Sequence, residues 1–221
     1  MSIALKIKEI TNELPKQTRL VAVSKFHPVS SIREAYDAGQ RIFGESRVQE
    51  LMSKYDQLPS DIEWHFIGHL QVNKVKYIAP FIHTIQSADS LKLMVEINKH
   101  AGNLGRKIRV LLQIHIAQEE SKYGFSFDEI EDLLKKDAFS AYPHLIIAGL
   151  MGMATFTDDE KQVREELSGL ASFYRKIKNT FFPDSADFKE LSMGMSDDYP
   201  IAVEEGSTLI RIGSKIFGNR Y

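Results

Sequence analysis

The sequence predicts an α/β fold, a (β/α)8 TIM barrel formed by a single domain over residues 1–221. Short apolar runs rich in β-branched residues alternate with segments of helical spacing along the whole chain. Several of these runs are continuously apolar, which is typical of a parallel sheet covered by helices. Eight strands within 221 residues favour a closed barrel, with an open doubly wound sheet as the alternative.

The predicted strands are the eight apolar runs at residues 20–25, 42–46, 64–68, 84–88, 109–116, 145–153, 190–194 and 209–214. In such a barrel the chemistry lies at the carboxyl edge of the strands, and phosphate groups often bind after strands 7 and 8. Small and polar residues collect at these strand ends, so they form the candidate site.

An additional helix is predicted before the first strand. Ile3, Ile7, Ile10 and Leu14 fall on one helical face, and Pro15 closes the pattern. A basic amphipathic helix of this kind could lie on a membrane, but we expect it to cap a packed core.

Four further segments have helical spacing, at residues 30–39, 87–102, 126–136 and 158–181. In the first, we expect the serines to form the N-cap and Gly39 to lie at the C-terminal end. In the second, Asp89 or Ser90 is the expected cap and Gly102 the expected end. The third begins with serine and acids and ends with two lysines, which matches the helix dipole.

Composition excludes several classes of function. The formal net charge is −2 and no basic arm is present, so nucleic acid is not an expected partner. No apolar stretch approaches the roughly 18 residues of a membrane span, and no signal peptide is recognisable. The chain has no cysteine, which excludes disulfides, thiolate metal sites and a cysteine nucleophile, and suits the cytoplasm.

Lys25 ends the first predicted strand, where a lysine could simply extend from the rim into water. Two glycine-containing turns favour a chemical role instead. In "LSMGMSDD" (191–198) Ser196 follows a glycine turn, and in "STLIRIGSKIFG" (207–218) Gly213 and Ser214 follow a strand. Both turns suit an anion such as phosphate, and strand 8 lies beside strand 1 in a closed barrel. Lys25 would then face a phosphate cradle.

A lysine beside a phosphate site suggests Schiff-base chemistry, because a neutral amine attacks a carbonyl carbon. Lysine has a reference pKa of about 10.4, so burial that lowered the pKa of Lys25 would raise its reactive fraction. The fitting ligand is an aldehyde on a phosphate-bearing ring.

These residues lie in stretches that, in this order, resemble the pyridoxal phosphate homeostasis family (YggS/PROSC-type proteins). The stretches are "LVAVSKFHP", "IFGESRVQE", "WHFIGHLQVNKVK", "EESKYGF", "GLMGMA" and "LSMGMSDDYPIAVEEGSTLIRIGSKIFGNR". The family is similar to the barrel domain of alanine racemase, which implies that barrel fold here without the racemase's second domain.

The resemblance implies that Lys25 holds pyridoxal 5′-phosphate (PLP) as a Schiff base. It further implies that Ser196, Gly213 and Ser214 bind the phosphate, with Met195 nearby, and that Arg211 faces the pyridine nitrogen. Arg211 and Gly213 share one side of a strand, which allows this arrangement.

Two points at this site stay open in the sequence. Arg211 could instead form a barrel ion pair with Glu45 or Asp89. The family usually has asparagine at the position of Ser46, so any contact from that asparagine is in doubt here.

The resemblance implies a non-catalytic protein that buffers PLP or delivers it to PLP-dependent apo-enzymes, and we expect a monomer. PLP catalysis works best with a protonated ring nitrogen, and arginine cannot supply that proton. The alternatives are an amino-acid racemase of the same fold, or an aldolase that uses Lys25 without a cofactor.

Other charged residues receive ordinary interpretations. His65 and His69 lie on a strand and a turn, so we do not expect them to bind a metal. His65 is interpreted as a packed or hydrogen-bonded barrel residue that could lie near the cofactor ring. Asp197 and Asp198 are expected to start a helix. Three lysines near the open rim could guide an anionic ligand or simply be solvated, and they are Lys74, Lys76 and Lys122.

Overall fold

The computed structural model describes residues 2–119 and 123–218. Within them, eight parallel strands close into a barrel in chain order, with β1 hydrogen-bonded to both β2 and β8. The predicted barrel and its eight strands are therefore confirmed. The strands are β1 (Arg19–Val23), β2 (Ile42–Glu45), β3 (Glu63–Phe66), β4 (Thr84–Ala88), β5 (Ile108–Ile114), β6 (Leu145–Gly152), β7 (Glu190–Ser192) and β8 (Leu209–Ile212).

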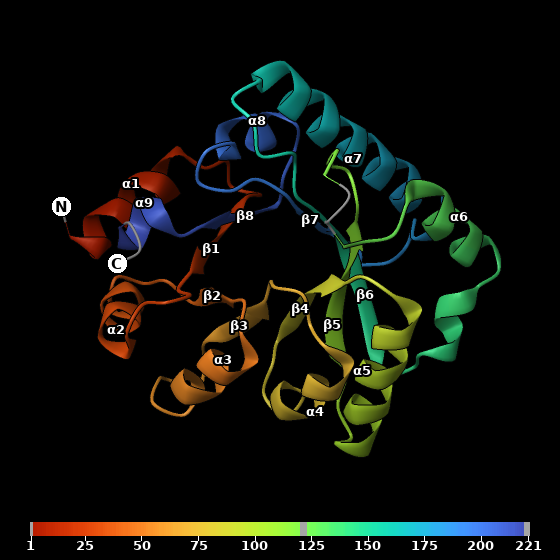
Figure 1. Cartoon of the computed structure of the whole chain (residues 1–221), viewed down its shortest axis with the longest axis horizontal. Helices are drawn as coiled ribbons and strands as arrows, with labels where there is room; N and C mark the ends of the chain where they lie inside the picture. The colour runs from red at the N-terminus through yellow and green to blue at the C-terminus, as the bar shows by residue number, and fades with distance from the viewer. Residues whose placement is uncertain (1, 120–122, 219–221) are drawn as a thin grey trace.

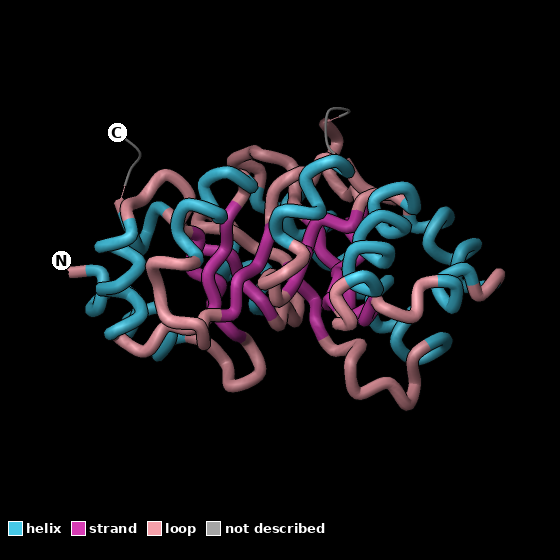
Figure 2. The backbone as a smooth tube through the Cα atoms, turned by 90° about the horizontal axis from the view of Figure 1, so that it is seen from below, coloured by secondary structure: helices cyan, strands magenta, loops and turns pink. Residues whose placement is uncertain are grey.

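Helices surround the barrel on its outside (Figures 1 and 2). The α-helices are α1 (Ile3–Glu13), α2 (Val29–Asp37), α3 (Val48–Tyr55), α4 (Val75–Ile78), α5 (Leu91–Asn103), α6 (Phe127–Lys135), α7 (Glu160–Phe181), α8 (Tyr199–Glu204) and α9 (Ser214–Phe217). Two short 3-10 helices, η1 (Val72–Lys74) and η2 (Ala138–Ala141), complete the described elements. None of these helices is long and apolar enough to cross a membrane.

The predicted additional helix is α1, which begins after its cap Ser2 and ends before Pro15. Ile7 and Ile10 are buried, as their spacing indicates. Helix α1 lies beside α9 (Figure 1), where Lys6 Nζ donates to the carbonyl of Ile216 at 3.2 Å. The helix thus packs against the last part of the described chain.

Two predicted helix ends are wrong. Helix α2 begins directly after Pro28, so the serines expected at its N-cap lie inside its first turn. Helix α5 is capped by Ser90, but it runs past Gly102 and ends before Gly105, whose φ of +62° suits a helix terminus. Gly102 has a packing role instead, because a Cβ there would lie 2.8 Å from the ring of His144.

The apolar core has two parts. The larger part fills the space between barrel and helices, and it includes the outward-facing Phe43 and Ile212. The smaller part lies inside the barrel and includes Val21, Met151 and Leu209. Above and below this inner layer, each end of the barrel has a cavity that is lined in part by polar side chains.

Strand β6 carries a bulge that depends on one glycine. Its register with β5 changes so that Val110 pairs with Ile147 but Leu111 pairs with Gly149. Gly149 has a φ of +149°, and a Cβ there would lie 1.8 Å from the carbonyl oxygen of Glu190 on β7. Only glycine therefore allows β6 to bend and still pair with β7.

Candidate functional site

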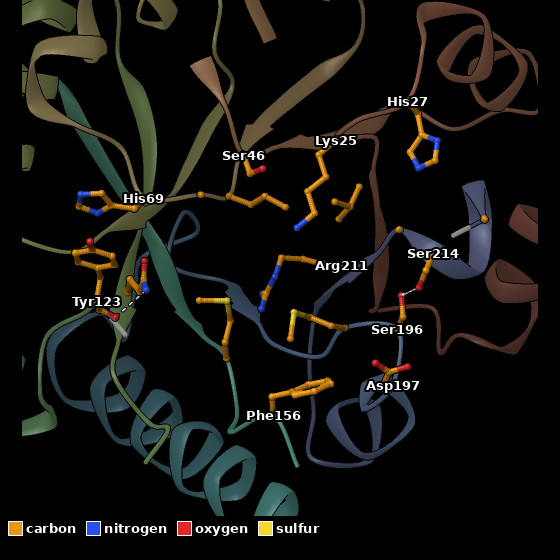
Figure 3. A pocket seen from close by; sticks show the side chains of 18 residues that line it. Lys25, His27, Ser46, His69, Tyr123, Phe156, Ser196, Asp197, Arg211 and Ser214 are labelled. Carbon is orange, nitrogen blue, oxygen red and sulfur yellow. Dashed lines mark hydrogen bonds between the residues drawn. The ribbon is translucent and has the colours of Figure 1, made fainter. Parts of the chain in front are cut away.

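A cavity of about 430 Å3 opens at the carboxyl edge of the barrel. All six residues that the sequence predicts for the site line it, together with Ser46. They are Lys25, Met195, Ser196, Arg211, Gly213 and Ser214. Figure 3 shows the Lys25 side chain reaching into the cavity toward Arg211, while Ser196 and Ser214 lie together at one side. The volume suits a small ligand or cofactor.

Lys25 lies in a turn two residues beyond the end of β1, because the strand ends at Val23 and not at Lys25 as predicted. Its side chain is half-buried. The turn is closed by a 3.1 Å hydrogen bond from the amide of His27 to the carbonyl of Ser24, and Phe26 has a φ of +68°. A phenylalanine with its backbone in the left-handed region is uncommon, and this conformation must be stabilised by surrounding contacts.

Three charged side chains, Glu45, Glu50 and Lys54, hold the backbone on both sides of Lys25, and we call them the Lys54 cluster. Lys54 Nζ donates to Glu45 Oε1 at 2.8 Å, to Glu50 Oε1 at 2.7 Å and to the Ser24 carbonyl at 2.9 Å. Glu45 Oε1 also accepts from Ser24 Oγ at 2.7 Å, and Glu50 accepts from the amide of Phe26. The two residues that flank Lys25 are thus tied to one buried amine.

Burial raises the pKa of Glu45, and the nearby Lys54 opposes this rise. The Glu45 carboxylate is fully buried and the Lys54 side chain is only 6% exposed. The two side chains therefore stabilise each other by contact inside the protein, where burying either charge without its partner would lower the stability of the fold.

Ser196 comes from the loop that follows β7, Ser214 is the first residue of α9 shortly after β8, and their hydroxyl oxygens are 3.0 Å apart. Gly213 precedes Ser214 and packs closely on β1, since a Cβ there would lie 3.1 Å from the carbonyl oxygen of Val23. The two predicted turns therefore meet and present a pair of hydroxyls to the cavity beside β1.

Arg211 is buried on β8 with its guanidinium in the cavity floor. It donates to Ser192 Oγ at 2.6 Å and to the carbonyl of Gly152 at 2.9 Å. The ion pair considered with Glu45 or Asp89 is wrong, because Glu45 pairs with Lys54 and Asp89 with His69. Burial lowers the pKa of Arg211 to about 10, so it stays charged at neutral pH.

The turn after β7 differs in detail from the prediction. Asp198 is the N-cap residue of α8 by position, but its side chain accepts from the amide of Met195 at 2.5 Å and caps no helical amide. Asp197 lies on the cavity wall. The acids thus shape the turn that carries Ser196 as well as starting the helix.

The far wall of the cavity includes His69, Tyr123 and Phe156, which are not among the six predicted site residues. His69 Nδ1 and Asp89 Oδ2 are 2.8 Å apart, and the ring of His69 stacks on Tyr123 with centroids at 3.8 Å. Phe156 is 84% exposed at the same mouth. Figure 3 shows His69 and Tyr123 across the cavity from the serine pair.

The remaining charged residues lie elsewhere. His65 is buried and hydrogen-bonded as interpreted, but it lines a second cavity at the opposite end of the barrel, away from His69. Lys74 and Lys76 flank the ring of Tyr77 and do not line the carboxyl-edge cavity. Lys122 lies outside the described residues.

The fold and this site define an alanine racemase N-terminal domain, and the family model of that domain matches residues 2–220. The chain belongs to the family of pyridoxal phosphate homeostasis proteins. It is 40% identical to the family member of Pasteurella multocida, over 91% of this chain and 86% of that protein. It is 41% identical to the Homo sapiens member, over 92% of this chain and 77% of that protein.

Solved structures agree with this assignment. PipY of Synechococcus elongatus, solved with PLP bound, is 36% identical and superposes with a TM-score of 0.88 over 98% of this chain and all of that chain. An alanine racemase of Clostridium difficile shares the fold at 15% identity, with a TM-score of 0.76 over 99% of this chain and 56% of that chain.

Proposed function

We propose that this chain binds PLP in the carboxyl-edge cavity and serves to buffer or deliver it, working as one domain over residues 1–221. Lys25 would hold the cofactor covalently, and Ser196 and Ser214 would bind its phosphate beside Gly213 and Met195. The observation that carries the proposal is one cavity that joins a lysine to a pair of adjacent hydroxyls. The names of the relatives and the PLP-bound PipY support the same ligand.

The residues present fit the group. PLP supplies an aldehyde, which condenses with a lysine amine with loss of water to form a Schiff base. Lys25 comes from the β1 side of the cavity, and the two serines come from the chain segments that follow β7 and β8. Arg211 lies below the tip of Lys25 in Figure 3 and lines the same cavity, so its donors would lie beside the ring of a ligand held there.

A carrier role is supported by Arg211. Its guanidinium is charged and has no acceptor, so it would leave a pyridine nitrogen unprotonated and weaken the electron withdrawal that PLP catalysis uses. We propose that the protein acts without turnover, as a monomer in the cytoplasm, and that PLP-dependent apo-enzymes receive the cofactor.

Reduction with borohydride tests the covalent assignment. Protein incubated with PLP, reduced and weighed by mass spectrometry should gain one reduced cofactor, and a Lys25→Ala variant should gain none. Lys215→Ala is the matched control, because Lys215 follows the cradle residue Ser214 and should leave labelling unchanged. Equal labelling of wild type and Lys25→Ala would refute the assignment.

The phosphate assignment needs a separate variant. Ser196→Ala with Ser214→Ala removes the paired hydroxyls while leaving Lys25 in place. We expect this double variant to bind PLP more weakly but pyridoxal, which lacks the phosphate, about as well as wild type. A parallel loss for both ligands would contradict a phosphate role.

A racemase is the second candidate, and one observation favours it. The hydrogen-bonded His69 and Asp89, with the stacked Tyr123, place acid and base groups on the cavity wall. Conversion of L- to D-amino acids by PLP-loaded protein, lost in His69→Gln, would support the racemase over the carrier.

A further inference from the structure

A second cavity, of about 200 Å3, lies at the amino-terminal edge of the barrel. It is lined by the first residues of several strands, including Arg19 of β1, Glu63 of β3 and Glu190 of β7. This end of such barrels ordinarily serves stability. The cavity therefore has no part in the proposed PLP site, and its polar groups need their own explanation.

The ring of His65 forms one wall of this lower cavity and is 3% exposed. Its Nδ1 lies 2.8 Å from Gln86 Nε2, while its Nε2 has no partner among the described residues. A buried ring nitrogen left without a partner costs stability unless something binds there.

A chain of hydrogen bonds determines which ring nitrogen of His65 carries the proton. Arg211 has only donors, so Ser192 Oγ must accept from it at 2.6 Å. The Ser192 hydroxyl then donates to Gln86 Oε1 at 2.7 Å, which turns the amide nitrogen of Gln86 toward His65. His65 Nδ1 is therefore an acceptor, and the proton of the neutral ring lies on Nε2.

The charge of His65 agrees with this assignment. Burial, with smaller contributions from His83, Arg19 and Arg109, lowers the pKa of His65 well below 6.5, so the ring is neutral and carries one proton. The unpartnered Nε2 is thus an N–H donor, and no group among the described residues accepts a hydrogen bond from it.

A metal ion is the competing occupant. Ligand atoms of Glu63, His65 and His83 lie within 4.8 Å of one another, as in a two-histidine, one-carboxylate site. A metal needs the lone pair of a neutral imidazole nitrogen, but the proton assignment blocks Nε2 and Gln86 covers Nδ1. The hydrogen-bond chain therefore disfavours the metal.

The charged side chains around the cavity include one lysine without a carboxylate partner among the described residues. Arg19, Arg109 and Lys189 line the cavity together with Glu63 and Glu190, and Glu63 Oε2 lies 3.8 Å from His83 Nδ1. Arg19 pairs with Glu190, and Arg109 pairs with Asp187 outside the cavity lining. Lys189 makes no ion pair with any residue in the described ranges 2–119 and 123–218. A positive charge and an N–H donor thus remain for a ligand.

We propose that the lower cavity binds a small oxyanion, with His65 Nε2–H as a donor and Lys189 as a counter-charge. The ligand class follows from what the cavity offers: donors and positive charge in a volume that holds an ion of phosphate size. Because His65 is joined to Arg211 through Gln86 and Ser192, the anion would lie at the far end of a hydrogen-bond chain that begins in the cavity floor of the upper site.

Nitrogen NMR of the histidine rings tests the proposal. The full chain, labelled with 15N-histidine and saturated with PLP, is titrated with sodium phosphate against sodium chloride of equal ionic strength. We expect His65 to be protonated on Nε2 and its ring signals to move saturably with phosphate. Lys189→Met should weaken this binding about tenfold, as for one charged hydrogen bond, and Lys92→Met on exposed α5 should not.

Three results would overturn the proposal: a His65 protonated on Nδ1, signals that do not respond to phosphate, or saturable Zn2+ binding through His65 Nε2. Lys189 is exposed, so its variant should fold and give an interpretable titration. Saturation with PLP keeps the upper site constant during the titration, although His65 is joined to that site through Gln86 and Ser192. PLP binding is followed separately by mass spectrometry after reduction, so its failure is distinguished from failure of the phosphate titration.

Discussion

Replacing Lys54 by methionine removes one buried charge while preserving most of the side-chain stem. In the folded protein, Glu45 would then remain fully buried with no cation, and its Oε2 already has no hydrogen-bond partner among the described residues. Breaking a buried ion pair in this way costs about 3–5 kcal/mol. We expect Lys54→Met to lose that amount of unfolding free energy at neutral pH, measured by urea denaturation.

The double variant separates charge from packing. Glu45→Gln alone should cost no more than about 1 kcal/mol, because the amide oxygen can still accept from Ser24 and Lys54. Adding Glu45→Gln to Lys54→Met should restore most of the loss. Lys99→Met is the control, since Lys99 forms an exposed pair with Glu96 and should change stability by less than about 1 kcal/mol.

The loss should also depend on pH in a defined direction. Burial already raises the pKa of Glu45 above 4.5, and removing Lys54 raises it further. The folded variant then binds a proton that the unfolded chain releases, so its stability falls as pH rises from 4.5 through the raised pKa. The difference in unfolding free energy between wild type and Lys54→Met should therefore become smaller as the pH is lowered toward 4.5. A Lys54→Met variant within about 1 kcal/mol of wild type at neutral pH would refute the reasoning.

Three further predictions concern positions outside this cluster. Gly149→Ala should fail to fold, or its free energy of unfolding in thermal denaturation should fall by about 4 kcal/mol or more, because the new Cβ would overlap a carbonyl of the next strand. The control is Gly169→Ala, in open space on α7, whose free energy of unfolding should stay the same or rise by up to about 1 kcal/mol. Burial raises the pKa of Tyr174 to about 12, so ultraviolet titration of wild type and Tyr174→Phe should differ only in the most alkaline range. Gly68→Ala places a Cβ 2.4 Å from a backbone oxygen at the cavity rim and should weaken PLP binding more than it lowers the melting temperature, a result that equal effects would contradict.

The barrel was predictable because its signals are local. Buried parallel strands appear as continuous apolar runs, and all eight lie within a few residues of their predicted bounds. The errors are at helix ends. Gly102 resembles a terminator, but it is needed for contact with His144, a residue 42 positions away that local pattern does not reveal.

The site was predictable only where strand ends carry it. Lys25, Arg211 and Ser214 follow from strand order, since a closed barrel brings β8 beside β1. Lys54 was not found, because its helix is charged like any surface helix and only the packing of α3 on β2 buries its amine. The Gln86 and Ser192 chain was missed for a similar reason, as it crosses the barrel between strands distant in sequence.

The contact between α1 and α9 bears on how the protein can be handled in the laboratory. Ser214 is the first residue of α9, and the other face of that short helix rests on α1 and on the ring of His27. Deleting the eleven-residue helix α1, or fusing a bulky tag next to it, would remove part of the packing that positions the Ser214 hydroxyl, which is proposed to bind the PLP phosphate. Fusions at this end are therefore a poor choice for affinity measurements.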